Sequence, residues 1–184
     1  MLEKGTPSGE IAVLSKAQGV LKSDATVKAA RGLSHFGEHS AGWFALGLIG
    51  AAVDKKRRKD WLVAAAGVVG AHAASIAVKR VVRRPRPDHP SVEVLVGTPS
   101  KLSFPSSHAT STTAAAVLYS GLSGRNLVPA LVPPMLASRL VLGVHYPTDV
   151  LAGAALGGLL GGLLRRKIGT VSRGTPAPGE GSRS

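Results

Sequence analysis

Three short runs of the sequence carry side chains that together could transfer a phosphoryl group. Residues 79–87 read KRVVRRPRP, residues 105–108 read PSSH, and residues 138–149 read SRLVLGVHYPTD. They supply three cations to hold an anion, two imidazoles for attack and proton transfer, and one carboxylate. These six side chains are Lys79, Arg86, Arg139, His108, His145 and Asp149. Because fixed cations can stabilise the transferring phosphoryl group, this chemistry needs no metal ion.

In their order and internal spacing, the runs resemble the signature of the type 2 phosphatidic acid phosphatase family. Its members are membrane lipid phosphatases related to the vanadium haloperoxidases, and the signature reads K-x6-R-P, P-S-G-H and S-R-x5-H-x3-D. This chain departs from it at Ser107, where the family usually has glycine. Serine adopts helical backbone angles easily, so we expect activity to survive. The resemblance implies a phosphoric monoester hydrolase without a cofactor.

By this resemblance, five residues bind the substrate phosphate. Lys79, Arg86 and Arg139 form a clamp, since guanidinium groups bind phosphate oxygens in pairs and an ammonium group acts as a point charge. Ser106 contributes its side chain and Ser107 its backbone at the start of a helix, where free N–H groups favour an anion. A serine before an apolar run is also an N-cap signal, so the serines at this helix start could serve both as cap and as phosphate ligand.

The basic run 79–87 has a second interpretation, as a juxtamembrane cluster that binds lipid headgroups. We favour it for the three arginines outside the signature, Arg80, Arg83 and Arg84.

The resemblance also assigns roles to the two histidines of the motifs. His145 is the nucleophile, whose phosphohistidine is then hydrolysed by water, and His108 is the general acid for the leaving alkoxide. Asp149 is placed to accept a hydrogen bond from the other ring nitrogen of His145, as in a catalytic triad. The alternative for His108 is a core histidine bonded to a carbonyl. The alternative for Asp149 is an N-cap, a role for which Thr148 competes.

The elements that must position these residues are membrane helices. Five mainly apolar segments come near the roughly 17–25 residues that a helix needs to cross a bilayer. They cover about residues 36–53, 61–82, 106–121, 127–143 and 148–164. The sequence therefore predicts an all-α polytopic membrane helical bundle of about five spans. Pro133 and Pro134 are expected to kink the fourth span or delay its regular part.

Two further segments flank the membrane-embedded phosphatase domain, which is predicted over residues 35–168. Residues 1–34 form an amphipathic N-terminal segment, helical over 8–34, that either lies in the membrane interface or packs on the rim of the bundle. Its lysines interrupt any apolar stretch, so we expect no signal peptide. Residues 169–184, rich in Gly, Pro, Ser and Arg, are predicted to be a disordered tail.

Antiparallel spans would place all three motifs on one side of the membrane, which the motif match alone does not require. The basic loop 54–60 and residues 165–167 fall on the opposite side, which the positive-inside rule makes cytoplasmic. The basic N-terminal segment argues the other way, but we give the short loop more weight. We expect a multi-pass protein of the cell (plasma) membrane with an extracytoplasmic active site.

Composition restricts other functions. The net charge of +13 often indicates nucleic-acid binding, but aromatic residues make up only 4% and the basic clusters flank apolar segments, so no nucleic-acid partner is expected. The chain has no cysteine, which excludes disulfides and thiolate metal sites. No two acidic residues stand at metal-ligand spacing beside a histidine, so no metal site is predicted.

Two features of the spans stay open at this point. Gly153, Gly157 and Gly161 are spaced four apart, which favours packing within the chain over a dimer seam but leaves a homo-oligomer open. His72 lies in the middle of the second span, where bundle packing and the lining of a substrate cavity are equal alternatives.

The motifs indicate the reaction but not the lipid. Within the family, stretches such as RGLSHFGEHS and SFPSSHATSTTAA resemble small actinobacterial members assigned as decaprenylphosphoryl-5-phosphoribose phosphatases of cell-wall arabinan synthesis. This resemblance implies a lipid phosphate substrate in the bilayer. The alternative substrates are a polyprenyl diphosphate, phosphatidate and phosphatidylglycerophosphate. Two other classes are a vanadate-dependent haloperoxidase, which the apolar spans oppose, and a non-catalytic membrane scaffold, which would need damaged motifs.

Overall fold

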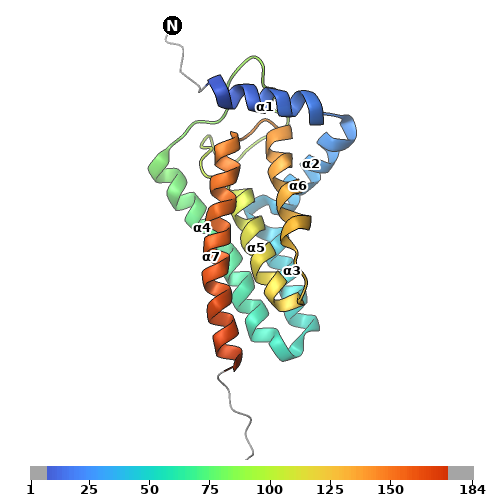
Figure 1. Ribbon diagram of the computed structural model, residues 1–184, viewed down its shortest axis with the longest axis vertical. Helices are drawn as coiled ribbons and strands as arrows, with labels where there is room; N and C mark the ends of the chain where they lie inside the picture. Colours follow the sequence, from blue (N-terminus) through green and yellow to red (C-terminus); the bar gives the residue numbers. More distant parts are fainter. Residues whose placement is uncertain (1–7, 174–184) are drawn as a thin grey trace, which may run out of the picture.

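The computed structural model describes residues 8–173, and every regular element in that range is a helix (Figure 1). The α-helices are α1 (Ser8–Leu21), α2 (Asp24–Gly37), α3 (Ala41–Val53), α4 (Arg58–Val82), α5 (Ser107–Ser123), α6 (Val128–Val141) and α7 (Pro147–Arg173). Short 3-10 turns, Glu38–Ser40 and Lys55–Arg57, precede α3 and α4. Within the described range, β pairing is limited to one bridge between Pro85 and Leu102. The predicted all-α class is confirmed.

The bundle is formed by α3 to α7, with α5 in contact with each of the other four. The buried side chains of α5 are mostly alanine, serine and threonine, and such small residues let helix backbones approach closely. The glycines of α7 face it: a Cβ atom on Gly157 would lie 2.2 Å from the Thr110 carbonyl oxygen, and one on Gly153 2.5 Å from that of Ser106. The glycine stripe therefore packs within the chain, as its spacing favours.

The helices α3 to α7 overlap the five predicted spans, but the number of membrane crossings stays a prediction. In the described residues, two segments are long and apolar enough to cross, Lys55–Val82 and Pro147–Ile168, while Val128–Val141 is a shorter apolar helix. Only 28% of the most apolar window of each long segment is buried. Their apolar side chains therefore lie largely on the outside of the bundle, as helices surrounded by lipid require.

The N-terminal segment is two helices rather than the single helix predicted over residues 8–34. The chain leaves α1 at Leu21 and enters α2 at Asp24. Ser23 causes this break as an N-cap, since its Oγ accepts a hydrogen bond from the Thr26 backbone N–H at 3.2 Å.

α1 lies across one end of the bundle (Figure 1). It buries Ile11, Leu14 and Gln18, which recur at helical spacing on one face. The Gln18 amide donates to the carbonyls of Glu93 at 2.7 Å and Val141 at 3.0 Å. Of the two alternatives for the N-terminal segment, these contacts favour packing on the bundle.

Two helix boundaries differ from expectation. α6 begins at Val128 and stays helical through Pro133 and Pro134, so the prolines do not delay it. α7 continues to Arg173, past residue 169, where the tail is predicted to begin. Residues 174–184 of that predicted tail lie outside the described residues.

The segments that carry the motifs meet at the end of the bundle near α1 (Figure 1). They are the end of α4, the loop 83–106, the start of α5 and the turn 142–146 between α6 and α7. The turn between α3 and α4, which holds the basic loop, lies at the other end.

Candidate active site

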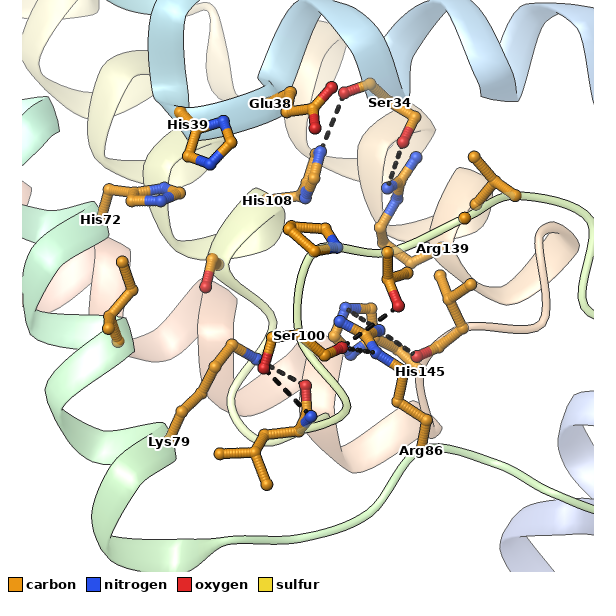
Figure 2. Close-up of a pocket in the computed structure, with 18 of the residues that line it drawn as sticks. Ser34, Glu38, His39, His72, Lys79, Arg86, Ser100, His108, Arg139 and His145 are labelled. Carbon is orange, nitrogen blue, oxygen red and sulfur yellow. Dashed lines mark hydrogen bonds between the residues drawn. The ribbon is translucent and has the colours of Figure 1, made fainter.

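A cavity of about 510 Å³ opens where the motif-bearing segments meet. Figure 2 shows the side chains of Lys79, Arg86 and His145 approaching it from three different segments. Six predicted site residues line the cavity: Lys79, Arg86, Ser107, His108, Arg139 and His145. The two others, Ser106 and Asp149, are fully buried and do not line it.

His145 is presented by the turn 142–146, and Gly143 makes that turn feasible. Gly143 has a φ of +67°, and a Cβ atom there would lie 2.3 Å from the Glu93 carbonyl oxygen. The His145 ring is 3% exposed. Its Nε2 is 3.3 Å from Nη1 of Arg86, and its Nδ1 is 3.5 Å from Oδ2 of Asp149. The second distance is long for a hydrogen bond, so it must shorten if Asp149 is to stabilise a charged ring.

The charge states around His145 suit nucleophilic attack. Burial first, and then the charge of Arg86 and the other cations, lowers the pKa of His145 well below its ordinary value. The ring is therefore neutral at neutral pH and keeps a lone pair on one nitrogen. Burial lowers the pKa of Arg86 to about 10, which still leaves it charged. Arg86 is fixed by hydrogen bonds to the carbonyls of Ser100 at 2.8 Å and Val144 at 2.6 Å.

Lys79 lies in the last turn of α4, with its ammonium group turned towards the loop before α5 (Figure 2). It is 6% exposed and donates to the carbonyls of Ser103 at 2.9 Å and Pro105 at 2.6 Å, with that of Leu102 at 3.4 Å. The charge that could bind phosphate therefore also fixes the loop that leads to His108.

Arg139 and His108 are both held by α2, in the segment that the sequence analysis leaves outside the phosphatase domain. Arg139 donates to Ser34 Oγ at 3.1 Å and to the Ala30 carbonyl at 3.3 Å. His108 Nε2 lies 2.9 Å from the Ser34 carbonyl oxygen, which can only accept, so this nitrogen carries a proton. Gly37 permits the approach, because a Cβ atom there would lie 2.8 Å from the His108 ring. His108 is thus both bonded to a carbonyl and exposed to the cavity.

The adjacent serines separate into two roles. Ser106 Oγ caps α5 by accepting from the Ala109 backbone N–H at 3.4 Å, which matches the N-cap signal of these serines. Ser107, the departure from the signature, lines the cavity, and its Oγ lies 2.7 Å from Ser75 Oγ on α4. The extra side chain thus has a polar partner instead of blocking the cavity.

Asp149 is held by Arg84, so the assignment of Arg84 to lipid headgroups is wrong. Arg84 Nη1 donates to Asp149 Oδ1 at 3.0 Å and to Thr148 Oγ1 at 2.7 Å. The guanidinium group lies 3.9 Å from the centroid of the Tyr146 ring. Its other end forms an ion pair with Glu10 of α1. Asp149 Oδ2 accepts from the Tyr146 backbone N–H at 2.8 Å, which braces the turn before α7.

Sequence reasoning missed Arg84 and Glu10 for different reasons. Nothing in the run 79–87 separates Arg84 from Arg83, although Arg83 is exposed and Arg84 is largely buried. Glu10 meets Arg84 and Thr148 only through folding, across 74 and 138 residues of sequence.

The cavity has an excess of positive charge. Asp149 is already paired with Arg84. The charged residues that line the cavity within the described range are Lys79, Arg80, Arg86, Arg139 and Glu38. Lys79, Arg86 and Arg139 are bonded to neutral groups, and buried cations without an anionic partner are unfavourable, so this arrangement favours an anionic ligand such as a phosphate group. In residues 8–173, no group of three or more His, Cys, Asp or Glu side chains is placed to hold a metal ion.

Known proteins resemble this chain in sequence. A profile of the PAP2 superfamily matches residues 60–173. A decaprenylphosphoryl-5-phosphoribose phosphatase of Mycobacterium tuberculosis (strain CDC 1551) is 55% identical over 159 residues, which cover 86% of this chain and 90% of that protein. A protein of the same name from Mycolicibacterium smegmatis is 58% identical over 148 residues, or 80% of this chain and 82% of that protein.

Two solved structures share the fold. A transmembrane PAP2-type phosphatidylglycerolphosphate phosphatase from Bacillus subtilis superposes with a TM-score of 0.77 at 24% identity, covering 91% of this chain and 88% of that one. LpxE from Aquifex aeolicus superposes with a TM-score of 0.69 at 18% identity, covering 90% and 99%. At these identities the likeness concerns the fold alone.

Proposed function

The chain belongs to the PAP2 superfamily, and from this we propose that it hydrolyses a lipid phosphate monoester through a phosphohistidine formed on His145. It is a phosphoric monoester hydrolase, like the phosphatases that it matches over most of its length. The observation that carries the proposed mechanism is the position of His145 Nε2, 3.3 Å from Arg86 in a cavity lined by buried cations.

In the proposed reaction, the phosphate oxygens lie against Lys79, Arg86 and Arg139. Nε2 of His145 attacks the phosphorus, and the bond from phosphorus to the leaving oxygen breaks. His108, whose Nε2 is held by the Ser34 carbonyl, gives that oxygen a proton from Nδ1.

The phosphorylated ring of His145 is positively charged, and Asp149 beside its Nδ1 stabilises this charge. Water then attacks the phosphorus and breaks the phosphorus–nitrogen bond. His108, now neutral, accepts the proton of the water, and inorganic phosphate leaves. Both histidines return to their starting states.

For the substrate we propose decaprenylphosphoryl-5-phosphoribose, in cell-wall arabinan synthesis. The support is identity of 55% and 58% to two phosphatases that carry this substrate in their names. Polyprenyl diphosphate, phosphatidate and phosphatidylglycerophosphate remain the alternatives. The last is named for the B. subtilis structure, whose identity to this chain is too low to carry a substrate.

We also propose that the protein is a multi-pass protein of the plasma membrane with an extracytoplasmic catalytic end. The support is the basic loop 54–60 at the far end of the bundle from the cavity, which the positive-inside rule places in the cytoplasm.

A phosphate-release assay on purified protein in detergent tests the proposal with a panel of the four lipid phosphates. We expect the phosphoribosyl lipid to give the highest kcat/KM, activity to persist in excess EDTA, and vanadate to inhibit as a mimic of five-coordinate phosphorus. His145→Ala should abolish turnover, and His89→Ala, on the exposed loop, should not.

The intermediate is tested by rapid quench of the wild type with labelled substrate. The protein should retain label that is labile in acid and stable in base. Full activity of His145→Ala, or loss in EDTA with rescue by Mg²⁺, would contradict the mechanism.

A further inference from the structure

The cavity is larger than a phosphate group needs, and part of its wall carries polar side chains other than the proposed phosphate-binding cations. A volume of about 510 Å³ is within the range of sites that enclose whole small ligands. This wall contains three histidines and one carboxylate, His35, Glu38, His39 and His72. The proposed mechanism uses none of them.

His72 has an unused hydrogen-bonding atom. Its Nδ1 is buried and has no hydrogen-bond partner among the described residues. Buried polar atoms are nearly always bonded, so an orphan at a cavity points to a ligand. His72 precedes Lys79 by two turns, roughly 10 Å along α4, so both side chains reach the same cavity. Of the two alternatives for His72, the structure thus supports cavity lining.

His39 faces His72 from a strained turn. The two ring centroids are 6.2 Å apart, and Figure 2 shows both rings away from Arg86 and His145. His39 and Ser40 both have left-handed backbone angles, with φ of 50° and 59°, which non-glycine residues rarely adopt. Such strain is typical of ligand sites.

The cations lie deeper in the cavity than the histidine pair. Lys79, Arg139 and His145 are buried, His72 is intermediate, and His39 is exposed at the rim. A substrate whose phosphate reaches the cations therefore places the group that carries the phosphate beside the histidine pair.

We propose that His39 and His72, with Glu38 at the rim, bind the hydroxyl groups of a sugar that carries the scissile phosphate. This inference rests on the proposed function and names the residues that select its substrate. A neutral imidazole has one donor and one acceptor, and adjacent sugar hydroxyls can satisfy both. A diacylglycerol leaving group would place ester oxygens there, which accept hydrogen bonds but donate none, so it could not bond both nitrogens of a neutral imidazole, which a hydrogen-bonding site disfavours.

The test compares substrates that share the phosphate monoester and differ in the leaving group. They are a short-chain polyprenylphosphoryl-5-phosphoribose, a short-chain phosphatidate and phenyl phosphate. His72→Phe should lower kcat/KM for the phosphoribosyl lipid by about 10-fold, the effect of one lost hydrogen bond. It should leave the sugar-free substrates within about 2-fold, which is less than one such bond. His39→Ala, at the exposed rim, should show the same selective loss even if His72→Phe folds poorly.

His89→Phe is the matched control, because His89 is exposed and bonded to Ser91, outside the cavity. This variant should leave kcat/KM unchanged for all three substrates. Equal losses on all three substrates in both cavity variants would overturn the sugar subsite and leave the proposed phosphatase intact. A wild type that hydrolyses phosphatidate but not the phosphoribosyl lipid would overturn the proposed substrate and this subsite together.

Discussion

At the scale of single residues, the histidine proposed as the nucleophile is the end of a chain of polar contacts. His145 faces Asp149, Asp149 is bonded to Arg84, and Arg84 pairs with Glu10. Arg84 does not line the cavity. It is therefore a positioning residue, which keeps a fully buried carboxylate charged and directed at the imidazole.

Replacing Arg84 should separate turnover from binding. We expect Arg84→Met to lower kcat at least about 10-fold, because Asp149 loses its cation and the imidazole its oriented partner. KM should change little, since Arg84 lies outside the cavity. Steady-state kinetics on the phosphoribosyl lipid would measure both values.

Arg83→Met is the control for this variant, since Arg83 is an exposed neighbour in the same basic run. Loss of kcat in both variants, or in neither, would argue against the positioning role of Arg84.

The protonation of His145 gives a second prediction at this scale. Its pKa is lowered by burial and by Arg86, so the neutral ring should persist as pH falls through the ordinary histidine range, about 6.5. In NMR of histidine-labelled protein, the signal missing from His145→Gln should titrate below the ordinary histidine range. Titration of that signal within the ordinary range would count against a buried, cation-flanked ring.

Spacing in the sequence predicted the residues of the cavity but not the residues that hold them. Five residues of the motifs stand at the fixed sequence intervals of the family signature, and the fold brings all of them to one cavity. They are Lys79, Arg86, Arg139, His108 and His145. Arg84, Glu10 and Ser34 act through contacts between distant segments. Such contacts depend on tertiary packing, which a single sequence does not encode as a local pattern.

At the scale of elements, the close contact of α5 and α7 fixes the start of α7, where Asp149 lies. This contact depends on the absence of side chains at one face of α7. Hydropathy predicted spans that overlap all five helices of the bundle, although in the described residues only two segments are long and apolar enough to cross a membrane. It missed the break before α2, although Ser23 followed by Asp24 is a typical helix start.

Two glycines of α7 provide a matched test of this packing. Gly157→Leu should destabilise the protein by about 1–3 kcal/mol through overpacking, since even a Cβ atom would meet the backbone of α5. Gly162→Leu should be nearly neutral, because a Cβ atom there has nothing within 4 Å. Thermal unfolding in detergent measures the difference. Equal stability of the two variants, with loss of a dimer in Gly157→Leu, would favour a seam between copies.

At the scale of the whole molecule, the segments that line the cavity and the basic loop 54–60 lie at opposite ends of the bundle (Figure 1). This separation agrees with the antiparallel arrangement of the predicted spans, whose membrane crossings stay a prediction. The orientation of the bundle in a membrane depends on charge in its surroundings and not on internal packing. It therefore needs an experiment of its own.

Single cysteines can report this orientation, because the chain has none of its own. Ser91 and Ser123 are both exposed, in the loop 83–106 and at the C-terminal end of α5. In intact cells stripped of their outer barrier, Ser91→Cys should react with a membrane-impermeant maleimide. Ser123→Cys should react only after lysis, and the reverse pattern would place the catalytic end in the cytoplasm.

The cavity wall combines residues inside the part of the chain that the superfamily profile matches with residues before it, and this has a consequence for selective inhibition. The cations proposed to bind the phosphate all lie within residues 60–173, the part that the superfamily profile matches. His35, Glu38 and His39 line the cavity from before that part, at the end of α2 and in the turn that precedes α3. A phosphate mimic alone would engage only the shared part of the wall and would discriminate poorly between superfamily members. A compound extended to the segment 35–39 would draw its discrimination from a part of the protein outside the profile.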